Sequence, residues 1–192
     1  MRLILASQSP RRQALLRRIT EDFTVVLPQI QERADPSWLP RELPEKLAAK
    51  KAAAVAQAYP DAVVIGADTV VVLDEQVLGK PEDREDACRM LRSLSGATHQ
   101  VYTGVALRRG KEELTFTQCT QVTFYPLEER QIQDYVASGE AFDKAGAYGI
   151  QGFGSLFVQE IHGDYFNVVG FPIARIAREL DCFCGMNGIK WK

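Results

Sequence analysis

The chain has 192 residues, of which 46% are hydrophobic and 25% are charged, and its formal net charge is -2. This composition is ordinary for one soluble globular domain with a substantial core. A sequence pI near 5.8 argues against a nucleic-acid-binding module, which usually has a strong basic excess. No apolar segment is long enough for a signal-peptide core or a membrane span, so we expect a cytoplasmic protein without a membrane partner.

The hydrophobic pattern predicts alternating strands and helices. In chain order it predicts a strand over residues 2–6, a helix over 10–19, a strand over 23–26, a helix over 41–59, a strand over 62–73, a helix over 81–94, strands over 98–108 and 114–124, a helix over 127–138, a strand over 155–161 and a helix over 171–181. Pro10 and Pro81 stand where a first helical residue is expected. We expect residues 66–69 to interrupt the strand over 62–73 and residues 109–111 to turn a hairpin. The order implies an α/β protein with a mixed sheet.

The loop after the first strand concentrates groups that bind anions. It reads Ser7-Gln8-Ser9-Pro10-Arg11-Arg12, with two hydroxyls and two adjacent guanidiniums. Residues 1–20 hold five arginines and no acid, whereas the whole chain is -2, so the rest of the chain sums to -7. A local positive cluster in an acidic chain predicts a site for a small polyanion such as a polyphosphate. The alternative is that Arg11, Arg12 and two later arginines, 17 and 18, lie on a solvated helix face.

Asp68 is the sharpest single candidate for chemistry. It lies in the most apolar stretch of the chain, where an unpaired carboxylate would cost several kcal/mol to desolvate. Asp68 must therefore have a partner. It is either a metal ligand and general base in a cleft or a structural acid that caps a turn at the strand break.

Four further residues are weaker candidates when each is taken alone. Glu32, Lys51, Lys80 and Gln151 have solvated side chains as their ordinary alternative. Gln151 lies in the glycine-rich segment 144–154, which can approach a ligand closely or can simply form tight turns. The segment is neither a Walker A loop nor a dinucleotide-binding motif. With only two distant histidines, the chain is expected to use carboxylates, lysines and arginines.

Taken together, nine stretches resemble the Maf family of nucleoside triphosphate pyrophosphatases. They are residues 5–12 (LASQSPRR), 30–32 (IQE), 47–52 (LAAKKA), 66–70 (GADTV), 79–81 (GKP), 94–96 (LSG), 99–101 (HQV), 144–152 (KAGAYGIQG) and 169–172 (VGFP). They follow the family's order, and the segments 66–69 and 147–152 are similar to the branch that hydrolyses dTTP and UTP. Lys50 departs from the family, which usually has glutamate there.

The resemblance implies one Maf-like domain over residues 1–184 and a short tail over 185–192. Its fold would be a mixed, twisted sheet flanked by helices, with two lobes around a central cleft, as in Maf and ITPase-like proteins. It also implies a homodimer, and hydrolysis of dTTP, UTP and modified pyrimidine nucleotides. Asp68 would be the proton acceptor, Glu32, Lys51 and Lys80 would belong to the phosphate and metal site, and Arg12, Thr69 and Gln151 would shape nucleotide selectivity.

Our hypothesis from the sequence is hydrolysis between the α and β phosphorus atoms of a nucleoside triphosphate. Glu32 and Asp68 would bind a divalent cation, Mg²⁺ or alternatively Mn²⁺. The phosphates would be held by the following residues: Arg11, Arg12, Lys51 and Lys80, with Ser7 or Ser9. The rival from another class is a regulator of cell division that binds nucleoside triphosphates without hydrolysing them.

Overall fold

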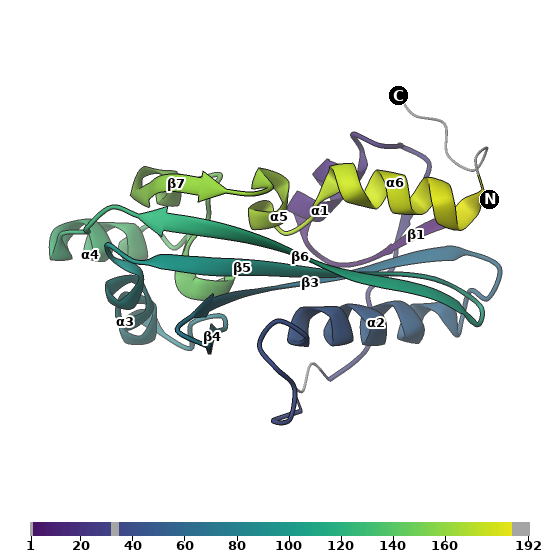
Figure 1. Cartoon of the computed structure of the whole chain (residues 1–192), viewed down its shortest axis with the longest axis horizontal. Helices are drawn as coiled ribbons and strands as arrows, with labels where there is room; N and C mark the ends of the chain where they lie inside the picture. Colours follow the sequence, from purple (N-terminus) through teal and green to yellow (C-terminus); the bar gives the residue numbers. More distant parts are fainter. Residues whose placement is uncertain (1, 32–34, 186–192) are drawn as a thin grey trace. The chain divides into compact units, whose positions relative to one another are not determined.

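The computed structural model describes residues 2–31 and 35–185 of the chain (Figure 1). Its strands are β1 (Leu3–Ala6), β2 (Thr24–Val25), β3 (Val63–Leu73), β4 (Gln76–Leu78), β5 (Thr98–Arg109), β6 (Glu112–Phe124) and β7 (Val158–His162). Its α-helices are α1 (Pro10–Leu16), α2 (Leu43–Ala56), α3 (Arg84–Leu94), α4 (Glu129–Ala137), α5 (Tyr165–Val169) and α6 (Ile173–Cys184). Two 3₁₀ helices are η1 (Ala145–Ala147) and η2 (Phe153–Phe157). Within the described ranges, no helix has both the length and the apolarity that a membrane crossing requires.

The strands form one sheet in the order β2-β1-β3-β5-β6-β7, with β4 paired to β3. β1 runs parallel to β2 and β3, whereas β3 with β4 and β6 with β7 are antiparallel. The predicted mixed sheet is therefore confirmed. The predicted hairpin is also confirmed, since β5 and β6 are neighbours joined at Gly110–Lys111.

The chain divides into two compact units. The first comprises residues 1–68, 103–118 and 170–192, and the second comprises residues 69–102 and 119–169. In the first unit, α2 and α6 lie on opposite faces of the sheet (Figure 1). A core cluster of small and branched side chains fills the space between α2 and the strands. Its members are Ile4, Ala6, Ala48, Ala52, Val55, Ala56, Ala62, Val64 and Ala106.

Close approach of α2 to the sheet depends on glycine and on a polar anchor. A Cβ atom added to Gly104 of β5 would lie 2.2 Å from the backbone nitrogen of Glu45, so only glycine fits beneath the helix. The Glu45 carboxylate accepts hydrogen bonds from the hydroxyls of Thr115 and Thr117 on β6, at 2.7 and 2.8 Å. The first turn of α2 is thereby fixed to two strands.

The second unit has an aromatic core and a pair of packed helices, α3 and α4. The rings of His99, Phe124 and Tyr148 meet edge to face, with centroids 4.8 to 5.4 Å apart. His99 Nε2 and the Tyr148 hydroxyl lie 2.8 Å apart and share a hydrogen bond. The HQV stretch of the sequence therefore has a core role in this unit.

Several predictions about the elements were wrong. The helix expected over residues 10–19 ends at Leu16, and residues 155–157, expected in a strand, belong to η2. β3 runs unbroken from Val63 to Leu73, and it is almost entirely buried. The expected break over residues 66–69 does not occur because the glycine there accommodates a helix and not a turn. α3 begins at Arg84 and not at Pro81, because the Asp83 carboxylate caps it by accepting from the backbone N–H of Asp86 at 2.8 Å. The short elements β4 and α5 were not predicted.

Candidate active site

Lys51 and Asp68 form a buried ion pair in the first unit. Lys51 Nζ lies 2.6 Å from Asp68 Oδ1, and the two side chains are only 8% and 12% exposed. Removing a carboxylate and an ammonium from water costs free energy, unless the attraction between the two charges offsets the loss of hydration. The prediction that Asp68 has a partner is confirmed, and the alternative of a solvated Lys51 is wrong.

The sequence around Gly66 explains how the pair forms. Gly66 and Asp68 are two residues apart on β3, so both face the same side of the sheet. A Cβ on Gly66 would lie 2.2 Å from the carbonyl oxygen of Ala48 and 2.9 Å from the amide nitrogen of Ala52. Helix α2 therefore lies directly on this face of β3, and Lys51 reaches Asp68 from it. No turn exists at Asp68, so the alternative that it caps a turn is wrong.

Arg12 lies next to this pair. Its Nη1 donates to the carbonyl oxygen of Ala67 at 2.8 Å, one residue before Asp68, and its Nε donates to the carbonyl oxygen of Gly170 at 2.9 Å. The alternative of a solvated Arg12 is wrong. Arg11 is half-buried on the same helix. Arg17 and Arg18 are exposed, as the solvated alternative predicts, but they follow the end of the helix at Leu16.

The two serines of the first loop hold its backbone. Ser7 is 5% exposed and follows β1, whose last residue pairs in register with Gly66. Its hydroxyl oxygen accepts from the amide of Ser9 at 3.2 Å and, more weakly, from Arg12 Nη1 at 3.4 Å. Ser9 caps α1 by accepting from the amide of Arg12 at 3.4 Å. The loop thus brings both serines and Arg12 to the carboxyl end of β1, close to the Lys51–Asp68 pair.

The other candidate residues are distributed differently. Thr69 follows Asp68 directly on β3 and is half-buried, whereas Lys80 and Gln151 are exposed. These three belong to the second unit. Inside that unit the amide of Gly146 donates to the carbonyl oxygen of Gly79 at 3.0 Å, so the GKP stretch lies beside the glycine-rich loop. Glu32 lies outside the described residues, and its role stays a prediction, as do those of the other three.

Lys50 and Lys51, although adjacent, have different environments. Lys50 is exposed, and its Nζ lies 4.5 Å from the centroid of the Trp38 ring. This distance is within the range of a cation–π interaction. Lys50 therefore contacts an aromatic ring, while Lys51 faces Asp68.

One contact of the site was missed by the sequence analysis. The carbonyl of Gly170 receives the Arg12 side chain, yet the VGFP stretch had no assigned role. Gly170 has φ of 103°, a backbone conformation that favours glycine. A glycine just before the Phe-Pro that precedes α6 was the available signal, but it does not identify which side chain the carbonyl accepts.

The donor set suits a magnesium-like cation that is shared with a substrate. Mg²⁺ is usually held by one or two carboxylates together with phosphate oxygens. Asp68 supplies one carboxylate, and Glu32 is the second predicted ligand. Across residues 2–31 and 35–185, no group of three or more His, Cys, Asp or Glu side chains is placed to hold a metal ion. A protein-only metal cage is thus not seen there, and the carboxylate chemistry fits a cation bound with phosphate.

The fold is of the α/β class, and a carboxylate, an ammonium and a guanidinium gather beside the carboxyl end of β1, which runs parallel to the strand that carries Asp68. The family model described as "Maf-like protein" matches residues 2–183. The chain belongs to this family.

Relatives of high identity share one name. The chain is 55% identical over 181 residues to a dTTP/UTP pyrophosphatase of Symbiobacterium thermophilum, covering 94% of this chain and 93% of the relative. Proteins of the same name from Bacillus cereus and Carboxydothermus hydrogenoformans are 50% and 51% identical over 182 residues each. These matches cover 95% and 94% of this chain and 95% and 97% of the two relatives. Among solved structures, the Staphylococcus aureus Ham1 protein is 15% identical with a TM-score of 0.47, covering 65% of this chain and 72% of that one.

Proposed function

We propose that this protein hydrolyses dTTP and UTP to the nucleoside monophosphate and pyrophosphate. Three relatives that span nearly the whole chain at about half identity carry the name dTTP/UTP pyrophosphatase. The observation that carries the proposal is the buried Lys51–Asp68 pair, with Arg12 bonded to the residue next to Asp68. A protein that only bound a polyanion would gain nothing from the Asp68 carboxylate unless it also bound a metal ion.

In the proposed reaction, water attacks the α phosphorus in line with the departing pyrophosphate. A bond forms between the water oxygen and the α phosphorus, and the bond from that phosphorus to the bridging oxygen breaks. Asp68 accepts the proton of the attacking water. The hydrogen bond from Lys51 Nζ fixes one carboxylate oxygen, and so orients the other toward the water.

Positive charge near Asp68 would stabilise the phosphates. Arg12 is held by two carbonyl oxygens, so its guanidinium is pre-organised and loses little freedom when a phosphate binds. Arg11 and Lys80 are the further cations of the proposal, and Ser7 and Ser9 supply hydroxyls. Asp68 and Glu32 would hold the divalent cation, which when bound neutralises charge on the phosphate oxygens.

Selectivity for the base is assigned to Arg12, Thr69 and Gln151. An exposed amide such as Gln151 offers both a donor and an acceptor, which is what a pyrimidine edge requires. We propose that exchanging Gln151 changes the preference among nucleotides more than the maximal rate. An equal loss across all nucleotides would contradict this role.

A panel of nucleoside triphosphates, incubated with the protein and Mg²⁺ while pyrophosphate release is measured, tests the proposal. Release that is fastest with dTTP and UTP supports it. Tight binding of nucleotides without release of pyrophosphate would instead identify the regulator. The replacement Asp61→Asn, at an exposed acid, is the matched control for variants of Asp68 and should keep wild-type rates.

A further inference from the structure

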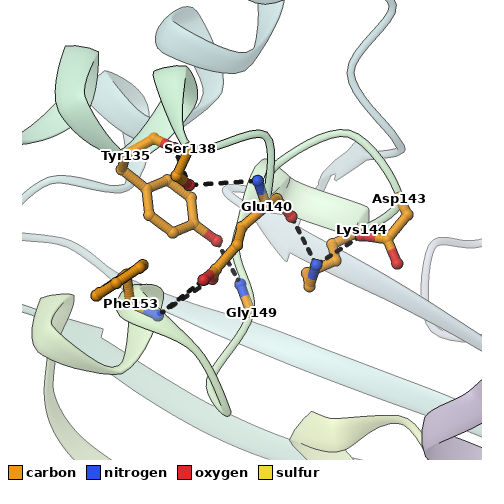
Figure 2. Close-up of polar contacts among 7 residues, drawn as sticks. All are labelled: Tyr135, Ser138, Glu140, Asp143, Lys144, Gly149 and Phe153. Carbon is orange, nitrogen blue, oxygen red and sulfur yellow. Dashed lines mark hydrogen bonds and ion pairs between the residues drawn. The ribbon is translucent and has the colours of Figure 1, made fainter.

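Polar side chains from α4 and the turn after it hold the loop that carries Gln151 (Figure 2). The hydroxyl oxygen of Tyr135 accepts from the amide of Gly149 at 3.0 Å. The carboxylate of Glu140 accepts from the amide of Phe153, with Oε2 at 3.1 Å and Oε1 at 3.3 Å. The loop backbone is therefore bonded at two points to side chains outside it.

Close contacts at three glycines leave no room for a side chain in this loop. A Cβ on Gly152 would lie 2.2 Å from Glu140 Oε2, and a Cβ on Gly154 would lie 3.1 Å from the Tyr135 hydroxyl. A Cβ on Gly149 would lie 2.5 Å from Cε of Lys144, whose Nζ donates to the carbonyl oxygen of Glu140 at 2.6 Å. Gly152 thus makes room for the Glu140 carboxylate, while Gly149 and Gly154 allow close contacts with Lys144 and within the loop backbone.

The two anchored amides are equally spaced in sequence on either side of Gln151. Gly149 and Phe153 are each two residues from it, and the Gln151 side chain is exposed. An exposed loop is ordinarily mobile, so its backbone must be fixed if one side chain is to be presented in one place.

The anchors are themselves well supported. Tyr135 is 4% exposed, and its ring meets that of Phe157 edge to face at 5.0 Å. The amide of Glu140 donates to the Ser138 hydroxyl at 3.3 Å, and that hydroxyl donates to the carbonyl of Tyr135 at 2.6 Å. Both anchors are thereby tied to the end of α4, which is an ordered element (Figure 2).

We propose that Tyr135 and Glu140 are positioning residues that set the nucleotide preference of the enzyme by fixing the loop that presents Gln151. This inference rests on the proposed function, in which Gln151 contacts the base. Neither residue is assigned a contact with the reacting atoms in that function. Their removal should therefore alter discrimination between bases while leaving the rate with the best substrate nearly unchanged.

The test compares four variants by kcat and KM for each nucleotide of the panel. Tyr135→Phe removes one hydroxyl and keeps the ring, and Glu140→Ala removes the carboxylate. Each should lower the preference for dTTP and UTP over the other nucleotides roughly three- to tenfold, as expected for one lost hydrogen bond, through KM and not kcat. Glu140→Gln keeps an oxygen that accepts from the Phe153 amide and should restore the preference. Glu129→Ala is the matched control, because Glu129 is an exposed glutamate on α4 that pairs with Arg92. It should leave the nucleotide preference unchanged.

The loop can also be followed without any turnover. Hydrogen exchange of the Gly149 amide should accelerate in Tyr135→Phe, and that of the Phe153 amide in Glu140→Ala, with recovery in Glu140→Gln. Unchanged exchange in both variants would overturn the proposal. This readout does not depend on which nucleotide the protein uses.

Gln151→Ala distinguishes the proposed role of Gln151 in base recognition from the positioning role of Tyr135 and Glu140. Once Gln151 is alanine, adding Glu140→Ala should not change the nucleotide preference further, because the anchor acts through Gln151. A wild-type protein that hydrolyses no nucleotide would contradict the proposed function. Normal turnover with altered preference in Gln151→Ala, but wild-type preference in Tyr135→Phe and Glu140→Ala, would overturn the positioning role alone.

Discussion

The side chain of Arg12 donates from Nε to the carbonyl oxygen of Gly170, 158 residues later in the chain, at 2.9 Å. The same guanidinium reaches Ala67 through Nη1. A lysine cannot make both bonds, because it lacks the fixed fork of a guanidinium. Arg12→Lys should therefore lower kcat/KM for dTTP about tenfold or more, although the charge is kept.

Arg17→Lys is the matched control for this prediction. Arg17 lies just after the same helix and is exposed, so its replacement by lysine should leave kcat/KM unchanged. If Arg12→Lys is as active as Arg17→Lys, the two carbonyl contacts do not organise a phosphate-binding group.

The Lys51–Asp68 pair predicts an asymmetric effect on stability. Lys51→Met leaves a buried carboxylate without its cation and should lower the free energy of unfolding by about 3–5 kcal/mol. Lys51→Met combined with Asp68→Leu removes both charges and should recover most of this loss. Denaturant unfolding followed by circular dichroism gives the free energy of unfolding of the wild type, of Lys51→Met, of Asp68→Leu and of the double variant.

An exposed ion pair offers the comparison. Arg130 and Asp134 are 3.5 Å apart with side chains 88% and 73% exposed, so Arg130→Met should cost less than about 1 kcal/mol. A Lys51→Met protein that loses no more stability than Arg130→Met would show that the pair is solvated in solution.

Gly66 predicts a steric effect on the packing of α2 against β3. Gly66→Ala would place a methyl group 2.2 Å from a helix carbonyl, and should lower the free energy of unfolding by about 2–3 kcal/mol or more. Gly79→Ala is the control, because a Cβ there meets nothing within 4 Å. Thermal unfolding should show a clear drop in Tm for Gly66→Ala and a small change for Gly79→Ala; equal changes would refute the close contact.

His99 predicts how stability depends on pH. Burial lowers its pKa from 6.5 to about 4, so between these values the unfolded chain binds the proton and the folded chain does not. The free energy of unfolding should therefore fall by about 3 kcal/mol as the pH decreases from 7 to 4. His99→Gln, which can still bond to Tyr148 but cannot titrate, should remove this part of the dependence.

Carboxylates affect the stability at lower pH than His99 does, so the two contributions can be separated. The pKa of Glu129 is lowered to about 2 by its hydrogen bond from Arg92, so its contribution is lost only below its ordinary value near 4.5. A pH profile of Tm that is identical in wild type and His99→Gln between pH 4 and 6.5 would contradict the burial of His99.

Local chemistry was readable from the sequence, whereas its partners were not. The desolvation cost of a charge shows that Asp68 needs a partner. The family resemblance places Lys51 in the same site, but it does not show that Lys51, on a separate helix, pairs with Asp68. The same limit applies to Gly66: a glycine inside an apolar run indicates either a break or a close approach, and only the position of α2 decides between them.

The secondary-structure elements also differed in how well the sequence predicted them. Helix α2 was predicted because its segment is rich in alanine and ends before a proline, and the hairpin because Gly110 lies between two strand-like runs. β4, with three residues, is too short to show a period. Tyr135 and Glu140 gave no signal either, because a tyrosine and a glutamate near the end of a helix are ordinary residues until the loop they hold is seen.

The most direct test of the account is single-turnover hydrolysis of dTTP by Asp68→Asn, at a temperature where thermal unfolding shows the variant to be folded. Asparagine keeps an oxygen that accepts from Lys51 but cannot take a proton from water, so nucleotide binding should persist while pyrophosphate release falls by about 10²–10⁴-fold. Asp61→Asn should hydrolyse dTTP at the wild-type rate. Near-normal release of pyrophosphate by folded Asp68→Asn would contradict the claim that Asp68 is the proton acceptor.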